Sequence, residues 1–344
     1  MTINYNIALI GFGNVNRTLA EVIRTTGSTI ARDLGFTLTV TAITDLRFGA
    51  LVDAGGIDLD AVLALAPGET FVGLGGTAEC DNETVIRTAP ADIIAEATFT
   101  NPNNGQPALD HVRWALAAGR SVCTTNKGPA AFAARELREL ARQNGVRFEY
   151  EGAVMSGTPV LRLAAGPLRG VGMRGFSGIL NGTSNYILGR LEAGMGQAEA
   201  IREAQERGYA EANPTADIGG SDVRLKVMVL VEALFGVVLA PADIPLTGIT
   251  GITPELVAAA AAQGTKWKLI GQAVRGEDGR VTASVAPQML GSDHPLAGIT
   301  GVTNALMFDT DFLGQVTISG PGAGRRETAY ALLSDIIAIH DSRA

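Results

Sequence analysis

Short apolar runs alternate with amphipathic segments along the first 150 residues of the chain. The apolar runs predict strands at residues 6–10, 37–44, 92–99, 121–125 and 147–151. Apolar positions at helical spacing predict a helix that extends to residue 34 and others at residues 59–64, 108–118 and 129–142. Strands alternating with helices form a parallel, doubly wound sheet, so we expect a Rossmann-like α/β domain over residues 1–150.

The pattern changes at the glycine-rich segment 151–159, which we interpret as the crossing into an α+β domain over residues 151–319. Its strands are predicted at residues 176–180, 266–274, 280–287, 305–308 and 315–319, and its helices at residues 183–191, 197–207, 222–236 and 254–263. We expect Thr183 or Ser184 to cap the first of these helices. A C-terminal segment, residues 320–344, should return a last helix to the first domain.

A glycine turn between the first strand and the first helix is typical of a dinucleotide-binding unit. Gly11 allows the tight turn, and Gly13 lets the backbone approach a pyrophosphate at the helix N-terminus. Asn16 stands where a third glycine or an alanine is usual. The residues that we assign to this part of a cofactor site are Gly11, Phe12, Gly13, Asn14 and Val15.

Polar residues follow the later strands, where ligands of a parallel sheet bind. Asp45 ends the second strand and would accept hydrogen bonds from the ribose hydroxyls of NAD, whereas Arg47 would favour the 2′-phosphate of NADP. The choice of cofactor therefore stays open. The other strand-end candidates for the cofactor site are Thr98, Thr100, Asn126 and Lys127. Gly322 joins them if the turn at residues 320–324 is a cofactor contact; a plain strand-to-helix turn fits equally well.

Charged residues interrupt an otherwise apolar helix near the middle of the second domain. Asp222 and Lys226 lie one turn apart and point toward its apolar side, while Arg224 and Glu232 mark the polar side. A solvated surface pair is one interpretation. The alternative is a pocket that Asp222 and Lys226 form together with Glu211 and Asp217 of the preceding loop. Such a pocket could bind a small zwitterion and move a proton.

The composition narrows the classes of partner. The chain has 344 residues, 46% of them hydrophobic, and a net charge of −8 without a basic patch, so we expect no nucleic-acid partner. Two cysteines without metal-ligand spacing indicate neither a zinc site nor a disulfide framework, and they fit a reducing cytoplasm. We expect no membrane segment, because no long uncharged apolar run occurs. The three histidines are interpreted as structural.

The chain resembles the homoserine dehydrogenases over nearly its whole length. The resemblance rests on TNKGP at 125–129, YEGAVMSGTP at 150–159, GILNGTSNYIL at 178–188, GYAEANPTADIGGSDVRLK at 208–226, HPLAGITGVTNAL at 294–306 and GPGAG at 320–324. It implies NAD(P)-dependent interconversion of L-aspartate 4-semialdehyde and L-homoserine by a homodimer, whose second domain binds substrate and forms the dimer. It also implies a short form, without the regulatory ACT domain or a fused aspartate kinase.

The resemblance also implies roles for individual residues. Lys226 or Lys127 would transfer the proton while hydride passes between nicotinamide and substrate, with Asp222 beside the reacting hydroxyl. The substrate-binding residues would be Glu211 and Asp217, at the amino group, with Gly208 and Tyr209. A monovalent cation, Na⁺ or K⁺, would be held by Glu151, Val154, Ser156 and Thr158. Two alternatives remain: a dehydrogenase of the same build acting on another amino acid such as aspartate, and a non-catalytic cofactor-binding sensor.

Overall fold

The computed structural model describes residues 2–343. In it the chain forms two compact units. The first runs to Gly157 and resumes at Gly324, and the second is Thr158–Ala323. Both boundaries fall a few residues later than the sequence pattern indicates. The first is later because Gly157 packs on the C-terminal helix: a Cβ at Gly157 would lie 2.6 Å from the carbonyl oxygen of Glu327.

The first unit is built on a six-stranded sheet of order β3-β2-β1-β4-β5-β6. All neighbouring strands are parallel except β3, which is antiparallel to β2. The strands are β1 (Ile3–Ile10), β2 (Phe36–Asp45), β3 (Gly49–Val52), β4 (Ile93–Glu96), β5 (Ser121–Thr124) and β6 (Phe148–Glu149). The expected Rossmann-like sheet is confirmed. The edge strand β3 was not predicted because its four residues are too few to show a periodicity.

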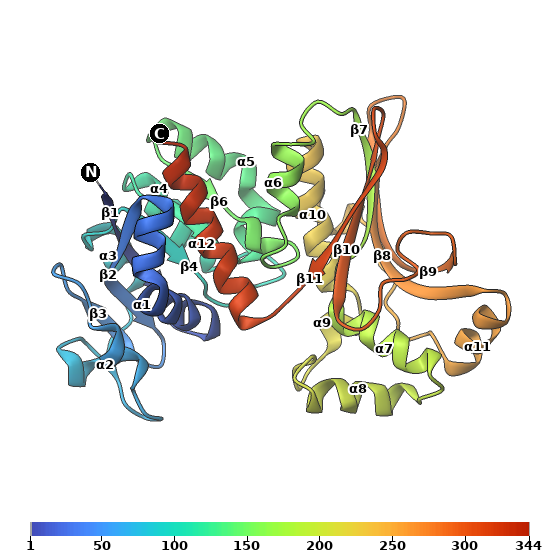
Figure 1. Cartoon of the computed structure of the whole chain (residues 1–344), viewed down its shortest axis with the longest axis horizontal. Coiled ribbons are helices and arrows are strands. Elements are labelled where there is room, and N and C mark those ends of the chain that lie inside the picture. Colours follow the sequence, from blue (N-terminus) through green and yellow to red (C-terminus); the bar gives the residue numbers. More distant parts are fainter. Residues whose placement is uncertain (1, 344) are drawn as a thin grey trace. The chain divides into compact units, whose positions relative to one another are not determined.

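Helices cover the sheet of the first unit. They are α1 (Asn14–Leu34), α2 (Leu59–Leu63), α3 (Asn82–Thr88), α4 (Ala108–Ala117), α5 (Lys127–Gln143) and α12 (Arg325–Asp341), with 3₁₀ turns η1 (Phe71–Leu74) and η2 (Glu151–Ala153). Helix α12 lies beside α1, and its Leu332 and Ile336 are fully buried in the same core as Leu9 and Leu19 (Figure 1). The return of the C-terminal helix to the first domain is confirmed.

The second unit is built on a five-stranded antiparallel sheet of order β11-β10-β7-β8-β9 (Figure 1). Its strands are β7 (Met173–Ile179), β8 (Thr265–Arg275), β9 (Val281–Gly291), β10 (Thr303–Thr310) and β11 (Gly314–Pro321). Its helices are α6 (Val160–Ala165), α7 (Gly182–Glu192), α8 (Gln197–Glu206), α9 (Thr215–Ile218), α10 (Ser221–Phe235), α11 (Pro254–Ala262) and the 3₁₀ turn η3 (Pro241–Asp243). The predicted α+β architecture is confirmed.

Helix α10 packs closely on this sheet. A Cβ at Gly271 of β8 would lie 2.7 Å from side-chain atoms of both Val223 and Val227, so glycine is what allows the approach. The helix is buried nearly all round, including Glu232, which is 3% exposed. The assignment of Glu232 to a polar side was therefore wrong, because the packing of neighbouring elements buries this position while Ala233 beside it is exposed. Within residues 2–343, none of the helices is long and apolar enough to cross a membrane.

Candidate active site

The turn between β1 and α1 brings backbone close to where a ligand would sit. Gly11 has a φ of 80°, in the left-handed region, and a Cβ there would lie 2.9 Å from the carbonyl oxygen of Ala97. Gly13 begins α1, whose described first turn has neither a capping side chain nor an acidic residue. The amide groups and the helix dipole at this end suit a pyrophosphate, so the turn fits the cofactor expected from the sequence.

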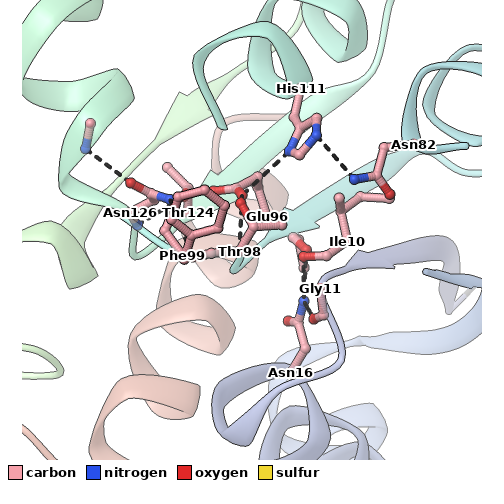
Figure 2. A network of polar contacts seen from close by, with 12 residues as sticks. Ile10, Gly11, Asn16, Asn82, Glu96, Thr98, Phe99, His111, Thr124 and Asn126 are labelled. Carbon is pink, nitrogen blue, oxygen red and sulfur yellow. Dashed lines mark hydrogen bonds and ion pairs between the residues drawn. The ribbon is translucent and has the colours of Figure 1, made fainter. Parts of the chain in front are cut away.

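Asn16 fills the position that a small residue usually occupies in this motif. Its side chain is fully buried, and Nδ2 lies within hydrogen-bond distance of the carbonyl oxygens of Ile10 (3.2 Å), Gly11 (2.8 Å) and Ala95 (2.9 Å). Figure 2 shows this amide beneath the turn. Where the usual motif has a small residue that allows close packing, Asn16 thus forms hydrogen bonds that connect β1, the turn and β4.

Asp45 is anchored to the glycine turn at the end of β2. Its Oδ2 accepts a hydrogen bond from the backbone N–H of Phe12 at 2.9 Å. Its Oδ1 accepts from the backbone N–H of Arg47 at 2.9 Å and from the Arg47 Nε at 3.1 Å. The carboxylate therefore holds Arg47 as its own partner at the position where the ribose of a dinucleotide is expected.

A buried polar cluster joins the carboxyl ends of β4 and β5, and we call it the Glu96 cluster (Figure 2). It consists of the fully buried Glu96 with Thr98, His111 and Thr124. Glu96 Oε1 accepts from the backbone N–H of Thr98 at 3.0 Å and from its hydroxyl, and Oε2 accepts from the Thr124 hydroxyl at 2.8 Å. His111 Nδ1 lies 3.6 Å from Oε1. One carboxyl group thus fixes two adjacent strand ends.

The Glu96 cluster extends to the start of α5. The hydroxyl of Thr124 accepts from the backbone N–H of Asn126 at 3.0 Å, and the Asn126 amide donates to the carbonyls of Thr98 (3.2 Å) and Phe99 (3.0 Å). Asn126 caps α5 by accepting from Gly128 N at 3.0 Å. Lys127, half-buried, is the first residue of that helix. The strand-end candidates Thr98, Asn126 and Lys127 are therefore brought together in one unit.

The second unit holds a charged cluster that we call the Lys226 cluster: Asn181, Asp217, Asp222 and Lys226. Lys226 Nζ donates to the carbonyl oxygen of Leu180 at 2.6 Å and to Asp222 Oδ2 at 2.7 Å. The Asn181 amide donates to Asp217 Oδ1 at 2.7 Å and to Asp222 Oδ2 at 3.0 Å. The side chains of Lys226 and Asp222 are only 8% and 18% exposed, so a solvated surface pair does not describe them.

The pKa of Asp217 is raised by its surroundings in this cluster. Burial raises its pKa, and the hydrogen bond from Asn181 is the next influence and lowers it. The negative charges of Asp222 and Glu211 raise the pKa further, while the ammonium of Lys226 lowers it. The cluster therefore has more carboxyl groups than cations, which suits a ligand that brings a positive charge.

The loop before the Lys226 cluster carries the other expected substrate residues. Gly208 adopts a left-handed φ of 71°, and the carbonyl oxygen of Tyr209 accepts a hydrogen bond from the Thr183 hydroxyl. The Tyr209 ring packs edge-on against Tyr186, with ring centroids 5.0 Å apart. Glu211 is exposed, but its charge acts on Asp217. The loop is thus tied to the start of α7, beside the cluster.

The residues expected to bind a cation lie at the end of the first unit and the start of the second. Glu151, Val154 and Ser156 are buried in the first unit, and Thr158 begins the second. Met155 and Ser156 have positive φ values of 56° and 53°, which are uncommon for residues with a side chain. A buried carboxyl beside this tight turn fits a cation. Residues 2–343 contain no group of three His, Cys, Asp or Glu side chains that could hold a metal ion.

Gly322 belongs to the second unit, whereas the other predicted cofactor residues belong to the first. A Cβ at this position would lie 2.1 Å from the side-chain amide of Asn304, which is 1% exposed and, among the described residues, has no hydrogen-bond partner for either amide atom. Glycine is thus required by the packing of this turn. Whether the turn also contacts a cofactor stays a prediction.

Asn181 and Glu96 are the site residues that the sequence did not reveal. The expected cap of α7 was Thr183 or Ser184, but Asn181 caps it by accepting from Ser184 N at 2.8 Å. The signal was present, because asparagine is as good an N-cap as serine and here precedes the glycine that starts the helix. Glu96 also gave a signal, because it is an acidic residue inside the apolar run predicted as a strand at residues 92–99.

The first unit has a glycine turn between the first strand and first helix of a mainly parallel sheet, and the second unit has a buried lysine paired with an aspartate. These two features are typical of a pyridine-nucleotide-dependent oxidoreductase. A family model described as homoserine dehydrogenase matches residues 159–337. The chain belongs to the homoserine dehydrogenase family.

Relatives support this placement over the whole chain. The chain is 51% identical to an NAD(+)-dependent homoserine dehydrogenase of Pseudomonas canavaninivorans, covering 98% of this chain and 97% of the relative. It is 36% identical to a homoserine dehydrogenase of Methanocaldococcus jannaschii, covering 98% and 99%. A solved hyperthermophilic archaeal homoserine dehydrogenase in complex with NADPH is similar with a TM-score of 0.84 and 29% identity, covering 99% and 98%.

Proposed function

We propose that this enzyme interconverts L-aspartate 4-semialdehyde and L-homoserine with Lys226 as the residue that moves the proton. The observation that carries the proposal is the position of the Lys226 Nζ, held between the Leu180 carbonyl and Asp222 Oδ2 in a buried setting. A lysine held in this way is typical of acid–base chemistry. Lys127 at the start of α5 is the second candidate for the proton transfer.

The first unit would hold NAD(P). Its pyrophosphate would lie on the turn at Gly11 to Val15, its ribose would contact Asp45, and its nicotinamide end would face Thr98, Thr100 and Asn126. The bound nicotinamide supplies the hydride in one direction and accepts it in the other. The Glu96 cluster supports this assignment, because it fixes the strand ends that carry Thr98 and Asn126.

The second unit would bind the substrate by its amino group and its oxygen. Glu211 and Asp217 would accept hydrogen bonds from the substrate ammonium, which supplies the positive charge that the Lys226 cluster lacks. In the reducing direction the Lys226 ammonium donates a proton to the oxygen as the alkoxide develops, and Asp222 holds the lysine in place. In the oxidising direction the neutral lysine accepts the hydroxyl proton.

We infer a preference for NAD over NADP. A 2′-phosphate would meet the Asp45 carboxylate, while Arg47, the cation that could bind it, is already engaged by Asp45. The 51% identical relative is named as NAD(+)-dependent, which supports the inference. Changing Asp45→Ala should raise kcat/KM with NADP relative to NAD; an unchanged ratio would refute the role of Asp45.

One absorbance assay tests the reaction itself. NAD(P)H formation is followed with L-homoserine, with aspartate and without substrate. Oxidation of homoserine supports the proposal, turnover of aspartate alone would show a different amino-acid dehydrogenase, and cofactor binding without turnover would show a sensor. Lys226→Ala and Lys127→Ala should each lower kcat at least ~100-fold, the low end for lost acid–base catalysis. Wild-type turnover in both variants would refute the lysine assignments.

We also propose a monovalent cation, Na⁺ or K⁺, at Glu151, Val154, Ser156 and Thr158. The buried Glu151 and the left-handed turn after it support the proposal. The Glu151 carboxyl and the neighbouring oxygen atoms would be the ligands of the cation. Replacing sodium and potassium by choline should lower the thermal midpoint of the wild type, and Glu151→Gln should abolish the difference.

We infer that the enzyme is a homodimer in the cytoplasm. The second unit supports pairing because β11 is an outer strand of eight residues with β10 as its only neighbour in the sheet, and exposed edges of this length are normally covered. The chain has only two cysteines, without metal-ligand spacing, which supports a reducing compartment. Light scattering coupled to gel filtration would give the mass of the assembly, and a monomer would refute the pairing.

A further inference from the structure

Asn181 bonds both carboxyl groups of the Lys226 cluster. It directly follows Leu180, whose carbonyl accepts from Lys226 Nζ, and it forms the N-cap of α7. Its own amide reaches Asp217 of α9 and Asp222 of α10. One side chain, 5% exposed, thus joins three helices at the point where the carboxyl groups meet.

The orientation of the Asn181 amide follows from its neighbours. Oδ1 lies 2.8 Å from Ser184 N, a backbone donor, so it must be the acceptor. Nδ2 then faces Asp217 Oδ1 at 2.7 Å and Asp222 Oδ2 at 3.0 Å, both acceptors. The reverse orientation would place the amide oxygen against two carboxyl groups and an N–H against an N–H. Each hydrogen of the NH₂ group therefore goes to a different carboxyl.

We propose that Asn181 is a positioning residue that holds Asp217 and Asp222 together, so that Asp217 binds the substrate ammonium and Asp222 stays against Lys226. The inference rests on the proposed reaction. Two carboxyl groups that share one donor would otherwise repel each other or share a proton. A neutral amide with two N–H donors prevents both outcomes without adding a cation that would compete with the substrate.

The charge around Asp217 predicts how its protonation would change. The groups whose charge acts on it are Asp222, Glu211 and Lys226. The Asn181 hydrogen bond lowers the pKa of Asp217 against the raising effects of burial and of the two acids. Losing that bond would raise the pKa of Asp217, so the group would become protonated at a higher pH and would no longer attract an ammonium.

Asn181→Asp separates positioning from helix capping. An aspartate keeps an oxygen for Ser184 N and caps a helix as well as asparagine, but it cannot donate to Asp217 or Asp222 and it adds a further carboxyl. We expect kcat/KM for L-homoserine to fall at least roughly tenfold, the effect of losing one hydrogen bond to a charged group, mainly through KM. We also expect the acid limb of the kcat/KM profile to move to higher pH.

Asn185→Asp provides the matched control. Asn185 lies one turn further along α7, is 2% exposed, and its amide donates to the carbonyls of Gly301 (3.0 Å) and Thr303 (3.4 Å) while its oxygen accepts from Lys268 Nζ at 3.0 Å. The same substitution there removes buried donors outside the Lys226 cluster. It should lower the thermal midpoint and leave the acid limb in place.

Asn181→Ser covers the case in which the aspartate variant does not fold. A serine hydroxyl can still cap α7, and it lacks the reach and the second hydrogen to join both carboxyls. It should raise KM with a smaller shift of the acid limb. Unchanged KM and an unmoved acid limb in the folded variants would overturn the role of Asn181 while leaving the reaction intact. A wild type inactive on homoserine would overturn the reaction and this role with it.

Discussion

The Glu96 cluster and the Lys226 cluster both bury an acidic side chain, at the end of strand β4 in the first and in the first turn of helix α10 in the second, and they surround it with different partners. Glu96 is fully buried and accepts hydrogen bonds from the Thr98 N–H and the Thr124 hydroxyl, and His111 Nδ1 of helix α4 lies 3.6 Å from its Oε1. Asp222 is 18% exposed and faces an ammonium and an amide. The first arrangement uses neutral dipoles to fix the backbone. The second keeps charges within reach of a ligand.

The difference shows which part of the molecule each cluster serves. Neutral donors satisfy a buried carboxyl and add no charge that responds to substrate, so the Glu96 cluster is suited to a rigid platform for the cofactor. An excess of carboxyl groups over cations leaves the Lys226 cluster incomplete until a positively charged group arrives. Acidic side chains thus fix the backbone in one unit and, under the proposed function, would bind the substrate in the other.

The largest expected effect is a loss of kcat on replacing Lys226, compared with the same replacement of Lys268, another buried lysine of the second unit. Lys226→Met should lower kcat at least ~100-fold, because it removes the proton donor. Lys268→Met is the matched change: Lys268 is 1% exposed, and its Nζ donates to the carbonyl of Ile299 at 2.6 Å and to Asn185 Oδ1. Burial lowers the pKa of Lys268. This variant should lose stability and keep near wild-type kcat; steady-state kinetics and thermal melts measure both. Equal losses of kcat would remove the distinction.

A medium effect is expected from Glu96→Gln. Each oxygen of Glu96 accepts from a donor, and a glutamine replaces one of those acceptors by an NH₂ group, which leaves a buried donor facing another donor. We expect a loss of about 1–3 kcal/mol in unfolding free energy and a raised KM for the cofactor. Denaturant unfolding tests the first. Glu139→Gln, at an exposed pair with Arg142, should leave the unfolding free energy nearly unchanged. An equal effect of both substitutions would contradict the platform role.

The smallest effect concerns salt. The Lys226 cluster is partly exposed, so raising ionic strength should screen its attraction for the substrate ammonium and increase KM for L-homoserine about twofold at saturating cofactor. Choline chloride as the added salt separates screening from binding at the proposed cation site. A KM that does not change with ionic strength would indicate that the substrate ammonium is not recognised by charge.

The architecture was largely predictable, because buried parallel strands are continuous apolar runs in the sequence, and glycine residues mark the turns between strands and helices. Asp222 and Lys226 were also predictable, because charged residues on the apolar side of a helix are unusual. The short elements β3 and α3 were missed, because β3 is four residues that begin at a glycine and α3 carries only two apolar residues, Val85 and Ile86.

The contacts that organise the site were not predictable. Asn181 meets Asp217 and Asp222 across separations of 36 and 41 residues, and Asn16 meets Ala95 across 79. Such pairs depend on how strands and helices are placed in space, which no periodicity encodes. Glu232 was assigned to the wrong side for a related reason, because its environment is set by neighbouring elements and the helix wheel shows only the helix itself.

The return of α12 to the first unit has a consequence for synthesis on the ribosome. Domains commonly fold in order from the N-terminus as the chain emerges. Here the core around Leu9 and Leu19 lacks Leu332 and Ile336 until helix α12 has been made, whereas the second unit is continuous and complete once Ala323 has emerged. The unit that begins second along the chain can therefore fold first, and the sheet of the first unit stays uncovered on this side until α12 has emerged.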